Sequence, residues 1–387
     1  LLIDQKIILE NVPMVKDILT MVNLLETLGK KIKIKKNKLE IISKNKQNYF
    51  AKYELVKTMR AGILVIGPLL AKFNNAKVSL PGGCAIGARP VDLHLDFLSK
   101  SGYENKVLKG YVVSKKKNLN NKISHTFKKI SVGATETAIL NSCFSNREVI
   151  LKNIATEPEV LDLIKFLNES GSNIRFVSKR SIIVKGVKNL KGIKYKIMPD
   201  RIEVGTYIIA SAITKSSLTL NNLFVEHIKN IVNVLKKTGL KFKYLSNTSI
   251  KVLPGKLKPL KVSTAPYPDF PTDMQAQLMS LLALTEGHSE IKEDIFENRF
   301  LHVLELQRMG ANIEIINNKA KIIGTKTLSG AQVMATDLRA SVCLVLAGLV
   351  AKGKTVINRI YHLERGYEDL VKKLKKCGAK IKIINVR

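Results

Sequence analysis

The sequence predicts an α/β protein built from six copies of one unit of about 70 residues. The first observation is a phrase that recurs six times, in which an apolar-periodic helix ends at a glycine and a short alternating strand follows. The second is the even spacing of these glycines, which lie 68 to 73 residues apart. The third is a strand upstream of each such helix, itself preceded by another apolar helix. The glycines are Gly29, Gly102, Gly171, Gly239, Gly310 and Gly378.

Each element of the unit has a local reason. The glycine follows the last helical residue because a left-handed cap is least costly without a Cβ atom. Strands such as AKVSL and EVILKNI precede that helix, and apolar stretches such as GILVIGPLLAKF predict a further helix before them. A unit of this length is too long for a solenoid repeat and fits a βαβ-type element that packs against its copies.

Six units divide naturally into three plus three. The boundary falls at the turn Lys196–Asp200, which predicts domains at residues 1–198 and 199–387. The first unit opens with only the end of its first helix, the last unit lacks its second strand, and the chain begins with Leu1. We therefore expect an upstream segment, absent from this sequence, that completes the sixth unit.

Composition narrows the class of protein. The 387 residues are 45% hydrophobic, which is enough for a sizeable core. The longest apolar stretch, Ala340–Ala351, falls short of the roughly 20 residues that a membrane span needs. The N-terminus has no signal-peptide pattern, and the four cysteines form no C-x-x-C pair. These features favour a reducing cytoplasm and no membrane association.

The net charge of +34 has two interpretations. One is nucleic-acid binding through phosphate neutralisation. The other is a general bias toward Lys, Ile and Asn, because the lysines are spread along the whole chain. No helix-turn-helix, RNP or zinc signature is present in the sequence. We favour the bias, combined with a basic cleft for anionic substrates.

A glycine-rich segment, PGGCAIGARP at Pro81–Pro90, is the first candidate for chemistry. Its glycines allow backbone N–H groups to approach a ligand phosphate and allow the loop to act as a lid. Cys84 stands at its centre with Arg89 nearby, and a neighbouring cation lowers the pKa of a thiol. A buried structural cysteine is the alternative, but Gly-Gly-Cys is not a core helix.

Arginine usage is the second candidate feature. The chain prefers lysine, yet arginine occurs in the compact polar motifs KTMRAG, GARPVD, FENRF, TDLRAS and LERGYE. Arginine offers a planar fork for carboxylate and phosphate that lysine cannot reproduce. Structural ion pairs are the competing explanation for each one. The arginines are Arg60, Arg89, Arg299, Arg339 and Arg365.

Three further polar residues have an ordinary explanation and a functional one. Asp273, in PYPDFPTDMQAQ, precedes an apolar helix, so the residues alone favour an N-cap over a catalytic base. The stretch KKISVGATET opens a helix and is a plausible pyrophosphate site, with Lys129 as counter-charge. His94 belongs to no ligand-spaced pair and is interpreted as structural.

Long motifs in order along the chain carry a family resemblance. They are PGGCAIGARPVDLH, KISVGAT, PDRIEVGT, APYPDFPTDMQAQ, FENRFLHVLEL, LSGAQVMATDLRAS and IYHLERGYE. Together they resemble the bacterial UDP-N-acetylglucosamine 1-carboxyvinyltransferases. The resemblance implies a two-domain inside-out α/β barrel of six βαβαββ units, the enolpyruvyl transferase fold. It also implies transfer of the enolpyruvyl group of phosphoenolpyruvate to UDP-N-acetylglucosamine, opening peptidoglycan synthesis, with no metal and no organic cofactor.

The resemblance also assigns roles. Cys84 resembles the residue that protonates the methylene carbon of phosphoenolpyruvate and is alkylated by fosfomycin. Asp273 resembles the group that takes the proton of the sugar 3-hydroxyl, which replaces the cap interpretation. Arg60, Arg89 and Arg365 resemble anion clamps. The implied substrate contacts are Arg60, Arg89, Pro90, Val91, Asp92, Leu93, Lys129, Ile130, Ser131, Val132, Asp273, Ile295, Arg299, Asp337, Arg339 and Arg365.

One departure from the family and three alternatives remain open. The family carries a GAKNA motif, whose lysine contacts phosphoenolpyruvate, just upstream of where this sequence begins. The alternatives are a truncated nucleotide-sugar-binding paralogue without catalysis, a 5-enolpyruvylshikimate-3-phosphate synthase and a basic nucleic-acid binder. The synthase is disfavoured because its Gly-Asn-Ala-Gly-Thr motif is not found here. The expected partners are the two substrates, with no nucleic acid, no membrane and no obligate protein partner.

Overall fold

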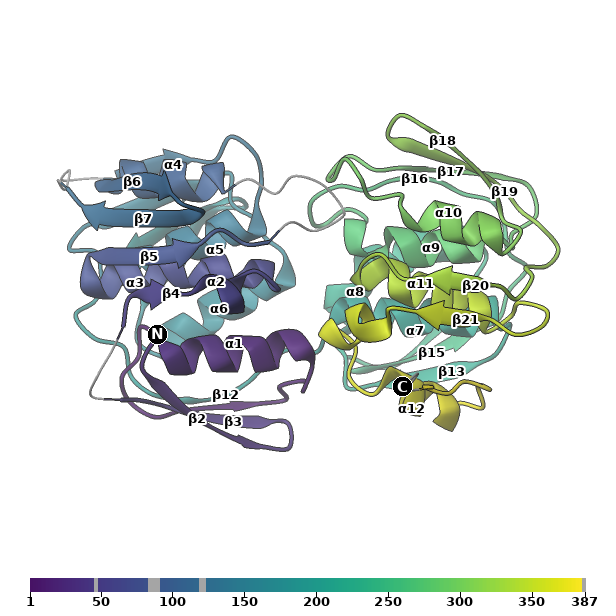
Figure 1. The fold of residues 1–387 in the computed structure, drawn as a ribbon, viewed down its shortest axis with the longest axis horizontal. Helices are drawn as coiled ribbons and strands as arrows, with labels where there is room; N and C mark the ends of the chain where they lie inside the picture. Colours follow the sequence, from purple (N-terminus) through teal and green to yellow (C-terminus); the bar gives the residue numbers. More distant parts are fainter. Residues whose placement is uncertain (45–47, 83–90, 118–122, 385–387) are drawn as a thin grey trace. The chain divides into compact units, whose positions relative to one another are not determined.

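The computed structural model describes residues 1–44, 48–82, 91–117 and 123–384 (Figure 1). Within these ranges the chain divides into two compact units, one of residues up to Met198 and one from Pro199 onward. Each unit combines helices with several small sheets, so the predicted α/β class is confirmed. None of the helices formed by these residues is both long enough and apolar enough to cross a bilayer.

The first unit contains three four-stranded sheets with one shared pattern. In each sheet a parallel pair, β12 with β1, β4 with β5 or β8 with β9, continues on its other side into an antiparallel hairpin. The strands are β1 (Ile7–Glu10), β2 (Lys30–Lys35), β3 (Lys38–Ser43), β4 (Phe50–Ala51), β5 (Asn75–Ser79), β6 (Tyr103–Leu108), β7 (Tyr111–Lys116), β8 (Ile123–Thr126), β9 (Glu148–Lys152), β10 (Asn173–Ser178), β11 (Ser181–Lys185) and β12 (Lys194–Lys196).

Helices of the first unit alternate with these strands along the chain. They are α1 (Lys16–Thr27), α2 (Tyr53–Val56), the 3-10 helix η1 (Arg60–Val65), α3 (Ile66–Phe73), α4 (Asp92–Lys100), α5 (Val132–Ser142) and α6 (Pro158–Glu169). Helix α3 packs directly on α5, and both bury most of their side chains. Gly67 allows this approach, because a Cβ atom there would lie 2.7 Å from the carbonyl oxygen of Thr137.

The second unit repeats the pattern. The sheet β16-β17-β19-β18 has the parallel pair and hairpin, the sheet β13-β15-β14 has three strands, and β20 pairs with β21 in parallel. The strands are β13 (Leu218–Asn221), β14 (Lys241–Ser246), β15 (Ser249–Leu253), β16 (Lys261–Ser263), β17 (His288–Lys292), β18 (Asn312–Ile316), β19 (Lys319–Ile323), β20 (Gln332–Met334) and β21 (Val356–Asn358). The helices are α7 (Arg201–Ile213), α8 (Val225–Lys237), η2 (Thr272–Met274), α9 (Gln275–Leu282), α10 (His302–Arg308), α11 (Leu338–Gly348), η3 (Ile360–Arg365) and α12 (Leu370–Lys376).

The core of the second unit is a group of mutually packed helices. Helices α7, α9 and α11 contact one another and lie side by side in the interior (Figure 1). All eight residues of α9 are buried, among them the polar Gln275, Gln277 and Ser280. A helix that is apolar on most sides belongs in a protein interior. Gln277 donates to the Asp273 carbonyl oxygen and Ser280 to the Gln277 carbonyl oxygen, whereas the Gln275 amide has no hydrogen-bond partner among the described residues.

The repeated glycines behave as the sequence predicts. Their φ angles lie between 89° and 98° at all six positions, in the left-handed region that side chains with a Cβ atom avoid. Each glycine lies two residues after the last residue of α1, α4, α6, α8, α10 or α12, with the C-cap residue between them. The expected six-fold repetition is therefore present in the backbone.

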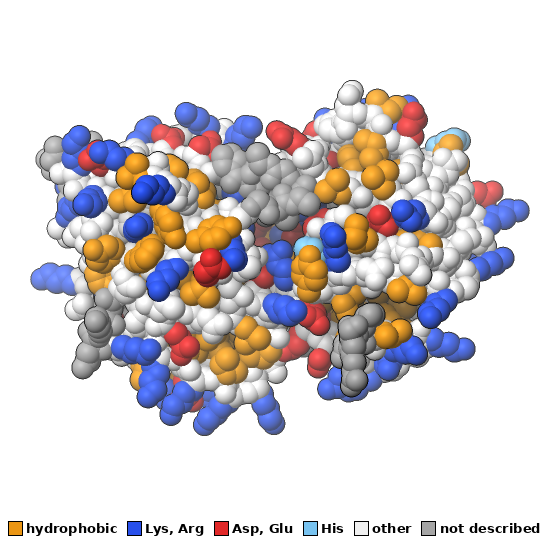
Figure 2. Space-filling view, in the orientation of Figure 1, with side chains coloured by type: hydrophobic (Ala, Val, Ile, Leu, Met, Phe, Trp, Pro, Cys, Tyr) orange, Lys and Arg blue, Asp and Glu red, His pale blue; other side chains and the backbone are white. Residues whose placement is uncertain are grey.

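Lys and Arg side chains are spread over the face drawn in Figure 2 rather than gathered in one patch.

The contact at Gly67 gives a stability prediction. Gly67→Ala places a methyl group 2.7 Å from a buried carbonyl oxygen, so α3 and α5 must separate locally. We expect a loss of about 1–3 kcal/mol in the free energy of unfolding, measured by urea denaturation. Gly348→Ala, at the end of α11, is the matched control, because its Cβ atom would meet the Thr355 side chain at ordinary contact distances of 3.4–3.6 Å. Equal stability of the two variants would contradict the packing argument.

Candidate active site

The carboxylate of Asp273 is the centre of a polar group in the second unit. Asp273 lies in η2, which leads into α9. Its Oδ1 atom accepts a hydrogen bond from Nη2 of Arg299 at 2.7 Å, and its Oδ2 atom accepts one from Nη2 of Arg339 at 2.9 Å. The cap expected from the residues alone is therefore wrong: the residue at the N-cap of α9 is Met274, and the Asp273 carboxylate binds two guanidinium groups instead.

The two arginines are much more buried than the carboxylate that they bind. The Arg299 and Arg339 side chains are 4% and 12% exposed, whereas that of Asp273 is 40% exposed. Burial opposes the charge of Arg339, but Asp273, Tyr367 and Asp200 outweigh burial and raise the Arg339 pKa above its ordinary value. The two guanidinium groups therefore supply fixed positive charge beneath a carboxylate that remains accessible to solvent.

Asp337 sets the start of α11 and hence the position of Arg339. Its Oδ1 atom accepts hydrogen bonds from the backbone N–H groups of Arg339 at 2.8 Å and of Ala340 at 3.1 Å. Burial lowers the pKa of the neighbouring His302 to about 4; the Asp337 charge acts against that shift and the Arg299 charge adds to it. His302 is thus neutral at neutral pH, and it belongs to this polar group although no sequence motif pointed to it.

Glu293 connects the predicted contact Ile295 with the Asp273 segment. Its Oε1 atom accepts hydrogen bonds from the backbone N–H groups of Ile295 at 2.9 Å and of Phe296 at 3.2 Å. Its Oε2 atom accepts a bond from the hydroxyl of Thr272 at 2.9 Å. The side chain of Ile295 remains 36% exposed, so an apolar group is presented on a rigid loop. Nothing in the sequence motifs pointed to Glu293.

Arg365, the remaining predicted arginine of this unit, lies at the end of η3. It is partly exposed and close enough to His362 for its charge to lower the His362 pKa, after the larger effect of burial. Two residues further on, Tyr367 is buried and hydrogen-bonded to Arg339. The motif LERGYE therefore supplies Tyr367 to the polar group, although the sequence had singled out only Arg365 in this motif.

In the first unit, predicted residues gather at the starts of η1, α4 and α5. Arg60 begins η1, Asp92 begins α4, and Ser131 caps α5 by accepting a hydrogen bond from the Ala134 N–H group at 3.3 Å. The first backbone N–H groups of a helix have no partner within the helix, which makes them donors for an anion. Lys129, two residues before the cap, is exposed.

His94 ties these helix starts together. Its Nδ1 atom lies 2.8 Å from the Thr137 hydroxyl on α5, and a Cβ atom at Gly133 would make a tight contact of 3.2 Å with its ring. Burial, and to a smaller degree the Arg60 charge, lower the His94 pKa to about 4 against the opposing effect of the Asp92 charge. The structural interpretation of His94 is thus supported by its contacts, and its charge coupling shows that Arg60 and Asp92 are close by.

The remaining predicted residues have simpler positions. Val91 is buried, while Leu93, Ile130 and Val132 are partly exposed at the same helix starts. Cys84, Arg89 and Pro90 lie outside the described residues. Their assigned roles stay predictions, as do the substrate contacts of all the other positions. In the part of the chain that the structure describes, no cluster of three or more His, Cys, Asp or Glu side chains could hold a metal ion.

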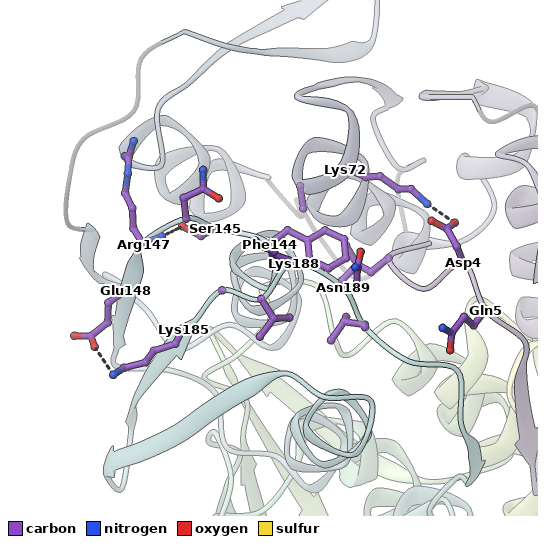
Figure 3. Close-up of a pocket in the computed structure, with 16 residues that line it drawn as sticks. Asp4, Gln5, Lys72, Phe144, Ser145, Arg147, Glu148, Lys185, Lys188 and Asn189 are labelled. Carbon is purple, nitrogen blue, oxygen red and sulfur yellow. Dashed lines mark hydrogen bonds and ion pairs between the residues drawn. The ribbon is translucent and has the colours of Figure 1, made fainter.

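A separate cavity of about 900 Å³ in the first unit contains none of the predicted residues (Figure 3). Charged side chains on its wall pair with one another, as Lys72 does with Asp4 and Lys185 does with Glu148. Figure 3 shows these pairs at opposite ends of the wall. Arg147 and Lys188 also line this cavity, and we assign no function to it.

Comparisons with known proteins place the chain in a family. The sequence model of the family described as EPSP synthase (3-phosphoshikimate 1-carboxyvinyltransferase) matches residues 1–374. Over 385 residues the chain is 53% identical to a UDP-N-acetylglucosamine 1-carboxyvinyltransferase of Pelagibacter ubique (strain HTCC1062), covering 100% of this chain and 92% of that protein. A protein of the same name from Endomicrobium trichonymphae is 47% identical, with the same coverage.

Solved structures agree with this at the level of the fold. The enolpyruvyl transferase NikO from Streptomyces tendae has a TM-score of 0.88 at 22% identity, covering 98% of this chain and 91% of that one. EPSP synthase from Acinetobacter baumannii has a TM-score of 0.75 at 13% identity, covering 98% and 92%. The predicted enolpyruvyl transferase fold is thereby confirmed. The chain belongs to the EPSP synthase family of transferases, and within it to the UDP-N-acetylglucosamine 1-carboxyvinyltransferases.

The low pKa of His94 predicts a pH dependence of stability. In the unfolded chain His94 binds a proton near pH 6.5, whereas in the folded protein it does so only near pH 4. The unfolded state therefore binds more protons than the folded state between pH 4 and pH 6.5. The stabilising contribution of neutral His94 to the free energy of unfolding is fully present above pH 6.5 and is lost as the pH falls toward 4. It amounts to at most about 3 kcal/mol.

The measurement is urea unfolding of the wild type and of His94→Asn from pH 4 to pH 7. The stability gap between the two proteins should widen as the pH rises through this window. His288→Asn is the matched control, because His288 is exposed to solvent in the folded protein. A gap that stays constant with pH would show that His94 titrates alike in both states.

Proposed function

We propose that this protein transfers the enolpyruvyl group of phosphoenolpyruvate to the 3-hydroxyl of UDP-N-acetylglucosamine and releases phosphate. The observation that carries the proposal is the accessible Asp273 carboxylate held by two buried guanidiniums. Support also comes from full-length relatives that bear the name of this activity. In this proposal the step belongs to peptidoglycan synthesis in the cytoplasm, and the two compact units act as domains of three repeats each, 1–198 and 199–387.

The chemistry divides between an acid and a base. The sugar hydroxyl oxygen forms a bond to the central carbon of phosphoenolpyruvate while its proton passes to Asp273. The methylene carbon takes a proton from Cys84. Such paired proton transfers to and from positioned groups commonly contribute a factor of about 10²–10⁴ to a rate. Loss of phosphate and of a methyl proton then restores the double bond in the product.

Fixed cations account for the anionic substrates. The start of α5, with its free N–H groups and exposed Lys129, suits the nucleotide diphosphate, and Arg60 supplies a further positive charge nearby. Arg365, which is partly exposed, suits the carboxylate or phosphate of phosphoenolpyruvate, because guanidiniums bind such groups bidentately. The nearly buried Arg299 and Arg339 add fixed positive charge behind Asp273. Fixed charges of this kind need no rearrangement as charge develops in the transition state.

Phosphate release tests the proposal as a whole. The full-length protein should release phosphate from phosphoenolpyruvate when UDP-N-acetylglucosamine is present, and not when shikimate 3-phosphate replaces it. We expect Cys84→Ala and fosfomycin treatment each to abolish most turnover, whereas Cys84→Asp retains activity because a carboxylic acid can also donate the proton. Binding of the nucleotide sugar without turnover would instead favour a non-catalytic paralogue, and wild-type turnover in Cys84→Ala would refute the acid role.

Asp273 has a separate test. Asp273→Asn keeps the shape of the side chain but removes the base and its charge, so kcat should fall by about 10²–10⁴ while nucleotide-sugar binding stays measurable by calorimetry. Asp269→Asn, an exposed change four residues upstream in the same segment, is the control and should leave kcat unchanged. If both variants turn over at the wild-type rate, Asp273 is not the base.

A further inference from the structure

The hydroxyl group of Tyr367 lies at a meeting point of three helices and the segment after η3. It is 3.1 Å from Nη1 of Arg339, 2.9 Å from the Thr206 hydroxyl and 3.4 Å from Nε2 of Gln277. These partners come from α11, α7 and α9. Tyr367 is only 4% exposed, so its hydrogen bonds are with the protein interior.

The direction of each bond follows from its neighbours. Arg339 can only donate. The amide orientation of Gln277 is fixed, because its Nε2 atom also donates to the Asp273 carbonyl oxygen at 2.8 Å. The second N–H of Gln277 is shared between the Tyr367 oxygen at 3.4 Å and the Thr206 oxygen at 3.2 Å. Because Arg339 also donates to the tyrosine oxygen, the tyrosine must direct its own proton elsewhere.

Thr206 is the acceptor of that proton. The Thr206 hydroxyl donates its own hydrogen bond to the carbonyl oxygen of Ile202 at 2.9 Å, one turn earlier in α7. Its oxygen is thus free to accept from Tyr367. Burial raises the Tyr367 pKa, so the hydroxyl keeps its proton at neutral pH. The chain of bonds runs one way only, from Arg339 to Tyr367 to Thr206 to the backbone of α7.

This chain fixes the orientation of the Arg339 guanidinium. Nη2 binds Asp273 and Nη1 binds Tyr367, so two ends of one planar group are held in different directions. The tyrosine ring also lies 5.7 Å from the guanidinium carbon. Rotation of the guanidinium would break both bonds at once. Gln277 adds a second link, since it binds the Asp273 backbone and the tyrosine together.

We propose that Tyr367, supported by Thr206 and Gln277, is a positioning residue that holds Arg339 against the Asp273 carboxylate during enolpyruvyl transfer. The inference rests on the proposed function of the site and adds residues that act without touching substrate. Small displacements of a catalytic group cost large rate factors, because the reacting geometry is a narrow one. The shorter of the two bonds that reach Tyr367 from the Asp273 side is the one from Arg339, so the contribution of Tyr367 to turnover should depend mainly on that arginine.

The test compares Tyr367→Phe with Tyr207→Phe in the full-length protein. The first keeps the ring and removes the hydroxyl that binds Arg339. The second removes a neighbouring hydroxyl that has no hydrogen-bond partner among the described residues. We expect kcat to fall about tenfold in Tyr367→Phe with KM for UDP-N-acetylglucosamine unchanged, and no change in Tyr207→Phe. Equal kcat values in the two variants would overturn the proposal.

Two further comparisons separate positioning from a general structural effect. In an Arg339→Lys background, Tyr367→Phe should lower kcat little further, because the hydrogen bond between Arg339 and the Tyr367 hydroxyl is already absent. The same tenfold loss in both backgrounds would overturn the proposal. Thr206→Ser, which keeps the accepting oxygen, should lose far less turnover than Thr206→Val, and an equal loss in both would remove Thr206 from the chain.

A readout without turnover keeps this inference distinct from the proposed function. Hindered rotation of the Arg339 guanidinium can be followed by nitrogen NMR of ¹⁵N-arginine-labelled protein, with Arg339→Lys identifying the signal. Rotation should be slow in the wild type and faster in Tyr367→Phe, whether or not the protein turns over. An unchanged rotation rate contradicts the positioning role. A wild type without turnover refutes the proposed function but leaves this measurement decisive.

Discussion

The ion pairs between Asp273 and its two arginines are the constraint on which the second unit depends. Arg299 and Arg339 are nearly buried, and a buried guanidinium without a partner costs several kcal/mol. Each of the three side chains must therefore be positioned within hydrogen-bond distance of its partner by a different segment. Asp273 lies in η2, Arg299 in the segment before α10, and Arg339 in α11. The surrounding polar contacts can be understood as the means of meeting that requirement.

Helix starts supply much of this control. Asp337 caps α11 and so fixes the first turn, which carries Arg339. Glu293 holds the loop at Ile295 and the hydroxyl of Thr272, one residue before Asp273. In the first unit Ser131 caps α5, and His94 packs against the same helix. Because a capped start has little freedom, the functional groups attached to it need few contacts of their own.

The sequence predicted the repeated architecture because that architecture rests on local rules. A glycine after each helix and an alternating strand after each glycine are readable without knowing the partners, and all six glycines adopt the expected φ angles. The polar group was predicted less completely. Arg299 and Arg339 stood out against a lysine-rich background, but Thr206, Glu293 and His302 did not. Their roles come from contacts between residues far apart in the chain, which no local pattern encodes.

The difference in solvent exposure between Asp273 and its two arginines decides which of these side chains a substrate can contact. Each oxygen of the Asp273 carboxylate accepts a hydrogen bond from one arginine. The Asp273 side chain is 40% exposed, whereas the two guanidiniums beneath it are almost covered. A group that approaches from solvent thus contacts the carboxylate first, and the guanidiniums act on it only through their positive charge. The arrangement can therefore accept a proton while its geometry stays fixed by bonds on the protein side.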